Sequence, residues 1–403
     1  MSHITSAASF PPVDRLTRFP LELFEHILDL VYGKDLVYGK DPRANLGLVS
    51  KAFLHFARRK LLPNLVIEEV DRLVKFCNYL TEHPQIGSYI ESLVIKLTQF
   101  PFTTFALTEV KLANLLQILV TLTSLEIVNF SRFTRLILDP PSDITPLPSL
   151  RELQIEERLC NDWANPFDPI HWTKLDRYPD LFTLRIDLHE DISQVAQNEY
   201  KKRSLPQDRE IQDLTVCAPI RDNPAFSDFL AHFSRLASLH LGRTNFAPLY
   251  DHLSHIPRPL RLQSLAFDLD SFLTAEIGQT FRRFPNITEL SFVGGTCTSQ
   301  ILSLLPTLLK LQTISFDYPT KLSSYSLQAF LETSSKSTTS FTIHLENVIS
   351  GLPWSYRTKR YRDVGWDDNY TKEGIRKCVE VASSGIRLEG KAVRKAFEFE
   401  ETD

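Results

Sequence analysis

A short hydrophobic phrase recurs along most of this chain. Two apolar residues flank a variable one, as in Leu93-Val94-Ile95, and a further apolar residue often precedes them by three positions. Alternation with a period of two is typical of a strand with one buried face. Eleven such phrases follow one another at steps of 24 to 32 residues, about 28 on average. They begin at Leu65, Leu93, Leu125, Leu153, Leu184, Leu214, Leu239, Leu265, Leu290, Ile314 and Phe341.

Helical segments separate the phrases. One covers residues 70–80 and ends before His83-Pro84, and another covers residues 225–233. A strand and a helix repeated near this period form the plan of leucine-rich repeats, in which each unit buries its apolar face against its neighbours. The chain resembles leucine-rich repeats in phrase and spacing. It is an irregular version, because the Asn or Cys usually found after the strand is mostly absent.

We therefore predict the α/β fold class: a small N-terminal helical module followed by a curved solenoid with a parallel sheet. The alternative is an ordinary α/β domain in which strands and helices alternate. Eleven similar units at a narrow spacing favour the solenoid.

The C-terminal segment follows a break at residues 350–371. We predict a helix from Lys372 to Ser383 that ends before Gly385, and a final strand from Ile386 to Leu388. The tail from Lys391 is expected to fray.

The first sixty residues follow a different pattern. Pro20 suits a first helical position, because its missing N–H would be unbonded there anyway. Apolar residues from Leu23 to Val31 then recur on one helical face. A second helical segment begins with Asp41 as N-cap and Pro42 just inside. The pattern predicts a small module of two or three helices.

These residues resemble an F-box. The family pattern opens with a hydrophobic-Pro pair, continues with Glu and a run of Leu and Ile, and closes with a Val-Ser/Cys-Lys-x-aromatic segment. Here these parts are Phe19-Pro20, residues 22–30 and residues 49–53. Phe19 replaces the usual Leu and Phe53 replaces the common Trp, and both keep the bulk of an apolar side chain. With the repeats behind it, the module resembles that of fungal-type F-box proteins with irregular leucine-rich repeats.

The resemblance implies a function. In the family, the module docks on a Skp-type adaptor, and through it on the cullin and RING subunits of an SCF-type ubiquitin ligase, while the rest of the chain binds a protein substrate. It implies no catalytic activity of the chain itself. The alternative is a non-catalytic leucine-rich-repeat scaffold whose N-terminal helices only cap the solenoid. The expected adaptor-binding residues are Leu16, Phe19, Pro20, Leu23, Phe24, Ile27, Leu28, Leu46, Val49 and Phe53.

A tandem duplication lies inside this module. Residues 30–35 read LVYGKD, and residues 36–41 repeat the same six letters. A perfect copy is best explained as a recent duplication in a loop, because loops tolerate insertions at a small entropic cost. We expect the loop to project beside the adaptor-docking surface, where it can alter adaptor binding.

Composition narrows the class of protein. The chain has 403 residues and a net charge of −4, which does not indicate a nucleic-acid surface. Its five cysteines are far apart and form no C-x-x-C motif, as is typical of a reducing compartment. The N-terminus does not read as a secretion signal, and no run of about 18 apolar residues predicts a membrane span. We expect a protein of the cytoplasm, the nucleus or both.

The chain also lacks the usual sequence signals of an enzyme. It has no phosphate-binding glycine loop, no nucleophile elbow and no zinc-protease helix motif. Its 11 histidines show no metal spacing with the cysteines. We predict no catalytic residues, no metal site and no cofactor.

The predicted strands define an open face. If Leu93 and Ile95 point inward, Val94 and Lys96 lie on that face. Along the array it carries slightly more carboxylates than cations, which favours a basic segment of a partner protein. A solvated face without a ligand is the alternative. The candidates for substrate binding on this face are Arg185, Asp187, His240, Asp268, Asp317 and His344.

Two longer loops add aromatic candidates. Residues 161–174 contain Trp163 and Trp172, and residues 354–377 begin with Trp354 and mix basic, acidic and aromatic residues. Such aromatics can anchor a partner. Packing of the loop onto the solenoid is the favoured explanation for the first loop, and a lid or partner-binding loop for the second.

We divide the chain into a disordered N-terminus (1–13), the F-box-like module (14–62), the solenoid (63–349), an insertion loop (350–371) and a last repeat with tail (372–403).

Overall fold

The computed structural model of the chain describes most of the predicted solenoid. The described residues are 63–97, 109–138, 147–157, 175, 178–188, 210–217, 224–242, 249–267, 269, 274–293, 295–316, 321–334, 340–345, 372–382 and 385–397. The F-box-like module, all ten expected adaptor-binding residues and the duplicated loop lie outside them. So do Asp268, Asp317, Trp163, Trp172 and Trp354.

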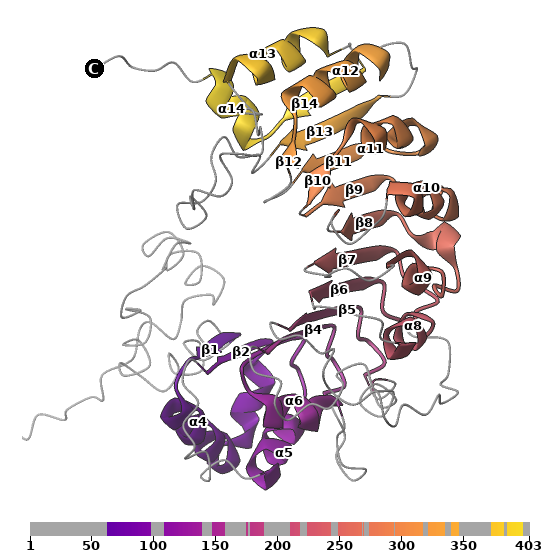
Figure 1. Ribbon diagram of the computed structural model, residues 1–403. Coiled ribbons are helices and arrows are strands. Elements are labelled where there is room, and N and C mark those ends of the chain that lie inside the picture. Colours follow the sequence, from indigo (N-terminus) through magenta and orange to yellow (C-terminus); the bar gives the residue numbers. More distant parts are fainter. Residues whose placement is uncertain are drawn as a thin grey trace, which may run out of the picture.

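A parallel sheet of twelve strands forms the inner face of a curved molecule (Figure 1). Each strand pairs with the strand of the repeat before and after it, so the order in the sheet follows the order in the chain. The predicted α/β solenoid is therefore confirmed. The strands are β1 (Asn64–Ile67), β2 (Ser92–Lys96), β3 (Ser124–Val128), β4 (Glu152–Glu157), β5 (Thr183–Leu188), β6 (Asp213–Cys217), β7 (Ser238–Gly242), β8 (Ser264–Phe267), β9 (Glu289–Phe292), β11 (Thr313–Phe316), β13 (Phe341–Leu345) and β14 (Ile386–Glu389).

Helices cover the outer, convex side of this sheet (Figure 1). They lie beside one another in chain order, and neighbouring helices such as α4 and α5 or α12 and α13 contact each other. The helices are α4 (Val70–Glu82), η2 (Pro84–Tyr89), α5 (Glu109–Ile118), α6 (Ser131–Leu138), α8 (Pro224–Leu230), α9 (Leu249–Leu253), η6 (Pro259–Arg261), α10 (Thr274–Arg283), α11 (Ser299–Leu304), η8 (Leu305–Thr307), α12 (Ser324–Ser334), α13 (Lys372–Val381) and α14 (Lys391–Phe397).

The core lies between the sheet and the helices. The two apolar positions of each phrase point into it: Leu93 and Ile95 on β2 are fully buried, and Val94 between them is partly exposed. The same positions pair in register from strand to strand, so they form two continuous apolar rows. Towards the C-terminal repeats the second row becomes aromatic. The rings of Phe267 and Phe292 lie 5.4 Å apart between centroids, and those of Phe292 and Phe316 lie 5.3 Å apart.

A second, two-stranded sheet is formed by the segments that follow β9 and β11 in the chain. It pairs β10 (Thr296–Cys297) with β12 (Lys321–Leu322), also in parallel. Gly295 precedes β10 with φ of +77°, a conformation that favours glycine and turns the chain after β9. The short strand after this turn was not predicted from the sequence.

The C-terminal end differs from the prediction in one respect. Helix α13 and strand β14 lie where they were expected, but the segment after Gly390 forms helix α14 instead of a frayed tail. Ala392 and Ala396 bury the inner face of this helix, and Arg376 Nε on α13 donates a hydrogen bond of 2.7 Å to the Ala396 carbonyl. Two small residues four positions apart gave too weak an apolar pattern to predict this packing.

Candidate interaction surface

The concave face of the sheet brings the outward residues of all strands into register. Its middle row runs from Val94 and Glu126 through Gln154, Arg185 and Thr215 to His240. Because neighbouring strands lie roughly 4.8 Å apart, each side chain in this row contacts or closely approaches the next. The phrase therefore builds a continuous surface out of residues that are about 28 positions apart in the sequence.

Three of the predicted substrate-binding residues come together on this face. Arg185 and Asp187 lie two positions apart on β5, so both point outward, and His240 lies two strands away on β7. Arg185 is exposed, and Asp187 and His240 are partly exposed. The fourth described candidate, His344 on β13, is four strands further along the sheet, roughly 19 Å from His240 at the spacing of parallel strands.

Carboxylates dominate the part of the face formed by β3 to β6. The outward positions of these strands carry five acidic residues and one cation, Arg185. Lys96 on the preceding strand pairs with Glu126, at 3.2 Å between Nζ and Oε1. We call this region the acidic centre; its carboxylates are Glu126, Glu152, Glu156, Asp187 and Asp213.

Glu152 and Asp213 were missed among the sequence candidates. They stand at the first position of their strands, one residue before the inward Leu153 and Leu214, where the same alternation places them on the open face. Burial raises the pKa of the Asp213 carboxyl, and a hydrogen bond with the Ser238 side chain lowers it less.

The middle row of the face between His240 and His344 has short side chains. Ala266, Ser291 and Ser315 occupy the middle row on β8, β9 and β11. At the far end, His344 Nδ1 lies 3.9 Å from a Glu389 carboxylate oxygen, and Arg387 lies 3.5 Å from the same carboxylate.

The C-terminal rim of the strands shows how close the packing is. Gly242 on β7 is in register with Cys217 on β6, and a Cβ atom added to Gly242 would lie 2.9 Å from Cys217 Sγ and 3.7 Å from His240 Nε2.

Within the described residues no group of three or more His, Cys, Asp or Glu side chains is placed to hold a metal ion. None of the described helices is both long enough and apolar enough to cross a membrane.

Comparison with known proteins adds little to this picture. No protein-family model matches the chain, and no curated protein matches it in sequence. Among solved structures, human 5T4 (Wnt-activated inhibitory factor 1, trophoblast glycoprotein) is similar at 14% identity with a TM-score of 0.34, over 62% of this chain and 88% of the 5T4 chain. TLR13, in a complex with ssRNA13, is similar at 14% identity with a TM-score of 0.29, over 66% of this chain and 40% of that chain. The solenoid fold follows from the strand order and register of the chain itself.

Proposed function

We propose that this chain is a non-catalytic substrate-recognition subunit of an SCF-type cullin–RING ubiquitin ligase. The observation that carries the proposal is the combination of an F-box-like pattern in residues 14–62 with a repeat body whose in-register face suits protein binding. The module docks the Skp-type adaptor, and the concave face binds the target. The chain then contributes to ubiquitin transfer by holding the target near the enzyme that carries ubiquitin, which is a proximity effect.

The acidic centre indicates the chemistry of the target segment. Five carboxylates against one arginine on β3 to β6 attract a segment rich in Lys or Arg. Charge complementarity of this kind raises the association rate and rejects acidic partners, while the neighbouring short side chains accommodate apolar contacts.

The adaptor interaction is tested with the full chain. Wild type and a Leu23→Asp/Ile27→Asp variant are co-expressed with a Skp-type adaptor and purified through a tag on the adaptor. We expect wild type to co-purify and the variant to be lost, because two carboxylates on the apolar helical face oppose its burial. Glu25→Lys/Asp29→Lys, on the opposite face of the same helix, is the matched control and should co-purify. Failure of the wild type to co-purify would refute the receptor function.

A leucine-rich-repeat scaffold capped by its own N-terminal helices is the second candidate. One observation favours it: on β1, the first described strand, Val66 is 57% exposed and Leu65 is only partly buried. Apolar side chains at the end of a solenoid normally require a capping unit. Deletion of residues 1–62 separates the two functions. The scaffold predicts a lower melting temperature and no lost partner, whereas the receptor predicts a solenoid that stays folded and loses the adaptor.

A further inference from the structure

A second charged surface lies on later repeats than the acidic centre. It is formed by three consecutive turns, which lead from α9 to β8, from α10 to β9 and from η8 to β11. We call it the basic rim; its cations are Arg258, Arg261, Arg282, Arg283 and Lys310.

Cations outnumber acids at the basic rim. Residues 251–263, 279–289 and 303–312 contain five Lys and Arg against two acids, Asp251 and Glu289, which lie at its borders, in a chain with a net charge of −4. Three of the turns of earlier repeats carry an acid instead, Glu91 before β2, Asp180 before β5 and Glu210 before β6. Arg235 in the α8–β7 turn is already paired with Glu210. The positive charge is therefore concentrated on three adjoining repeats.

Hydrogen bonds join these turns into one surface. Asn286 Nδ2 donates to the Leu260 carbonyl at 2.7 Å, which fixes the second turn against the first. The backbone N–H of Gln312 donates to the Thr288 carbonyl at 2.8 Å, which fixes the third turn against the second. A ligand therefore meets cations from all three repeats on a connected framework.

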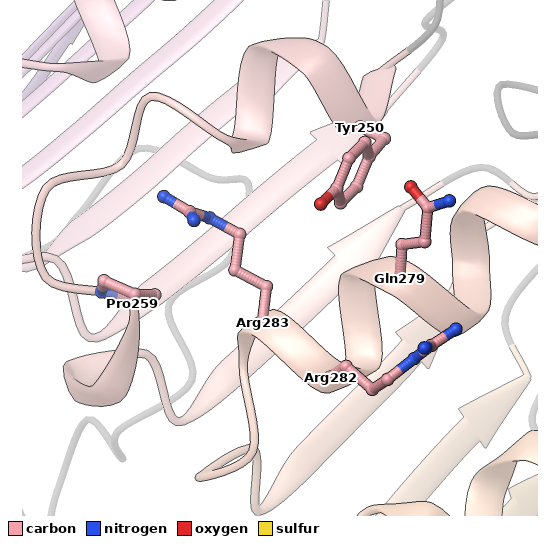
Figure 2. Close-up of a pocket in the computed structure, with 5 residues that line it drawn as sticks. All are labelled: Tyr250, Pro259, Gln279, Arg282 and Arg283. Carbon is pink, nitrogen blue, oxygen red and sulfur yellow. The ribbon is translucent and has the colours of Figure 1, made fainter.

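A shallow, open hollow of about 340 Å³ lies within the basic rim. Figure 2 shows its lining: Tyr250 from α9, Pro259 from η6, and Gln279, Arg282 and Arg283 from α10. The Arg283 side chain extends towards the Pro259 turn, where Nη2 donates to the carbonyls of Ser254 and Ile256. Its Nε is buried and has no hydrogen-bond partner among the described residues. This guanidinium is thus held in place with donor capacity left over.

Apolar side chains stand beside the cations. Leu260 in the first turn is 62% exposed, and Leu309 in the third is 79% exposed. They occupy the same position in their repeats, four residues before the first residue of the following strand, two strands apart in the sheet. At strand spacing this separation is roughly 10 Å, which three or four extended residues span.

We propose that the basic rim binds an acidic linear segment of a partner protein that also carries Leu or Phe. Carboxylates of such a segment pair with the arginines and enter the hollow at Arg282 and Arg283, while its apolar side chains cover Leu260 and Leu309. A nucleic acid offers the anions without aliphatic groups to cover two leucines, so a peptide fits the surface better. The partner is distinct in charge from the basic target expected at the acidic centre, and the inference does not depend on adaptor binding.

The test presents the immobilised full-length chain with a displayed library of random dodecapeptides. We expect two enriched groups: basic peptides, which bind the acidic centre, and acidic peptides with Leu or Phe, which bind the basic rim. Reversal of four exposed cations, Arg258→Glu, Arg261→Glu, Arg282→Glu and Lys310→Glu, should weaken binding of the acidic group about tenfold or more, as followed by fluorescence anisotropy. Binding of the basic group should not fall.

Matched variants show whether a loss of peptide binding comes from the basic rim, from the overall charge of the protein or from misfolding. Reversal of four exposed cations elsewhere, Arg72, Lys75, Lys391 and Arg394, should leave the acidic peptides bound within about twofold. Leu260→Ser/Leu309→Ser keeps every charge and should weaken the acidic peptides about threefold or more. The proposal is overturned if no acidic peptides are enriched, or if the rim variants bind them as wild type does. Stronger capture of single-stranded DNA or of phosphatidylserine vesicles would also overturn it.

Discussion

At the scale of single residues, position in the repeat decides reactivity. Burial raises the pKa of the Cys77 thiol to about 11, of Cys297 to about 12 and of Cys378 to about 11. Cys217 instead lies on the concave side of β6 and is only partly buried. None of these four described cysteines forms a disulfide. The sequence showed only that the cysteines are isolated, so the contrast in their surroundings required the structure.

A labelling experiment checks this contrast. We expect iodoacetamide at pH 8 to modify Cys217 first, and Cys77, Cys297 and Cys378 roughly a hundredfold more slowly, because a raised thiol pKa leaves little thiolate and burial blocks access. Peptide mass spectrometry after timed quenching gives the rate at each site. Equal rates for all four before unfolding in urea would contradict the buried positions. In urea the four should react alike.

At the scale of elements, the strands were predictable and their surroundings were not. Eleven strands of the main sheet lie where the phrases predicted them, and β14 lies where the final strand was expected, because the period-two alternation of a strand does not depend on the length of the loops. Gly87 shows what the sequence could not supply. A Cβ atom there would lie 2.4 Å from the Ile118 carbonyl oxygen, a contact between repeats that depends on how the turn and helix α5 pack. The acidic centre was half predicted, because Asp187 was named and Glu152 and Asp213 were not.

The aromatic row provides a test of core packing. Phe292 is fully buried between Phe267 and Phe316. We expect Phe292→Ala to lower the free energy of unfolding by about 3–5 kcal/mol, because the cavity cannot be filled from either side. Urea unfolding followed by circular dichroism measures the change. The control Leu309→Ala, at a side chain 79% exposed, should stay within about 0.5 kcal/mol of wild type. A similar loss for both would contradict the packing of the row.

At the scale of the whole molecule, contacts are local in sequence. Each strand pairs only with the repeat before and after it, so the sheet contains no pairing between distant repeats among the described strands. Stability of such an array is approximately a sum of repeat and interface contributions. Damage at one end should therefore stay at that end.

Hydrogen exchange tests this locality. Ile343 on β13 is 1% exposed, and we expect Ile343→Ala to speed amide exchange in α12, β13 and β14 while β2 to β4 keep their wild-type rates. The outward neighbour Thr342→Ala is the control and should change little, since its backbone donor to Gln312 remains. Faster exchange throughout the sheet would show instead that the repeats unfold as one cooperative unit.

The same strand order sets the mechanical behaviour of the chain. Tension applied to the two ends of the sheet acts equally on every strand pair, and a terminal repeat detaches first because it has one neighbour instead of two. Strands peel away singly, and each repeat of about 28 residues lengthens the molecule by roughly 9 nm of extended chain. The solenoid is thus expected to lengthen under tension in small, repeated steps, one repeat at a time.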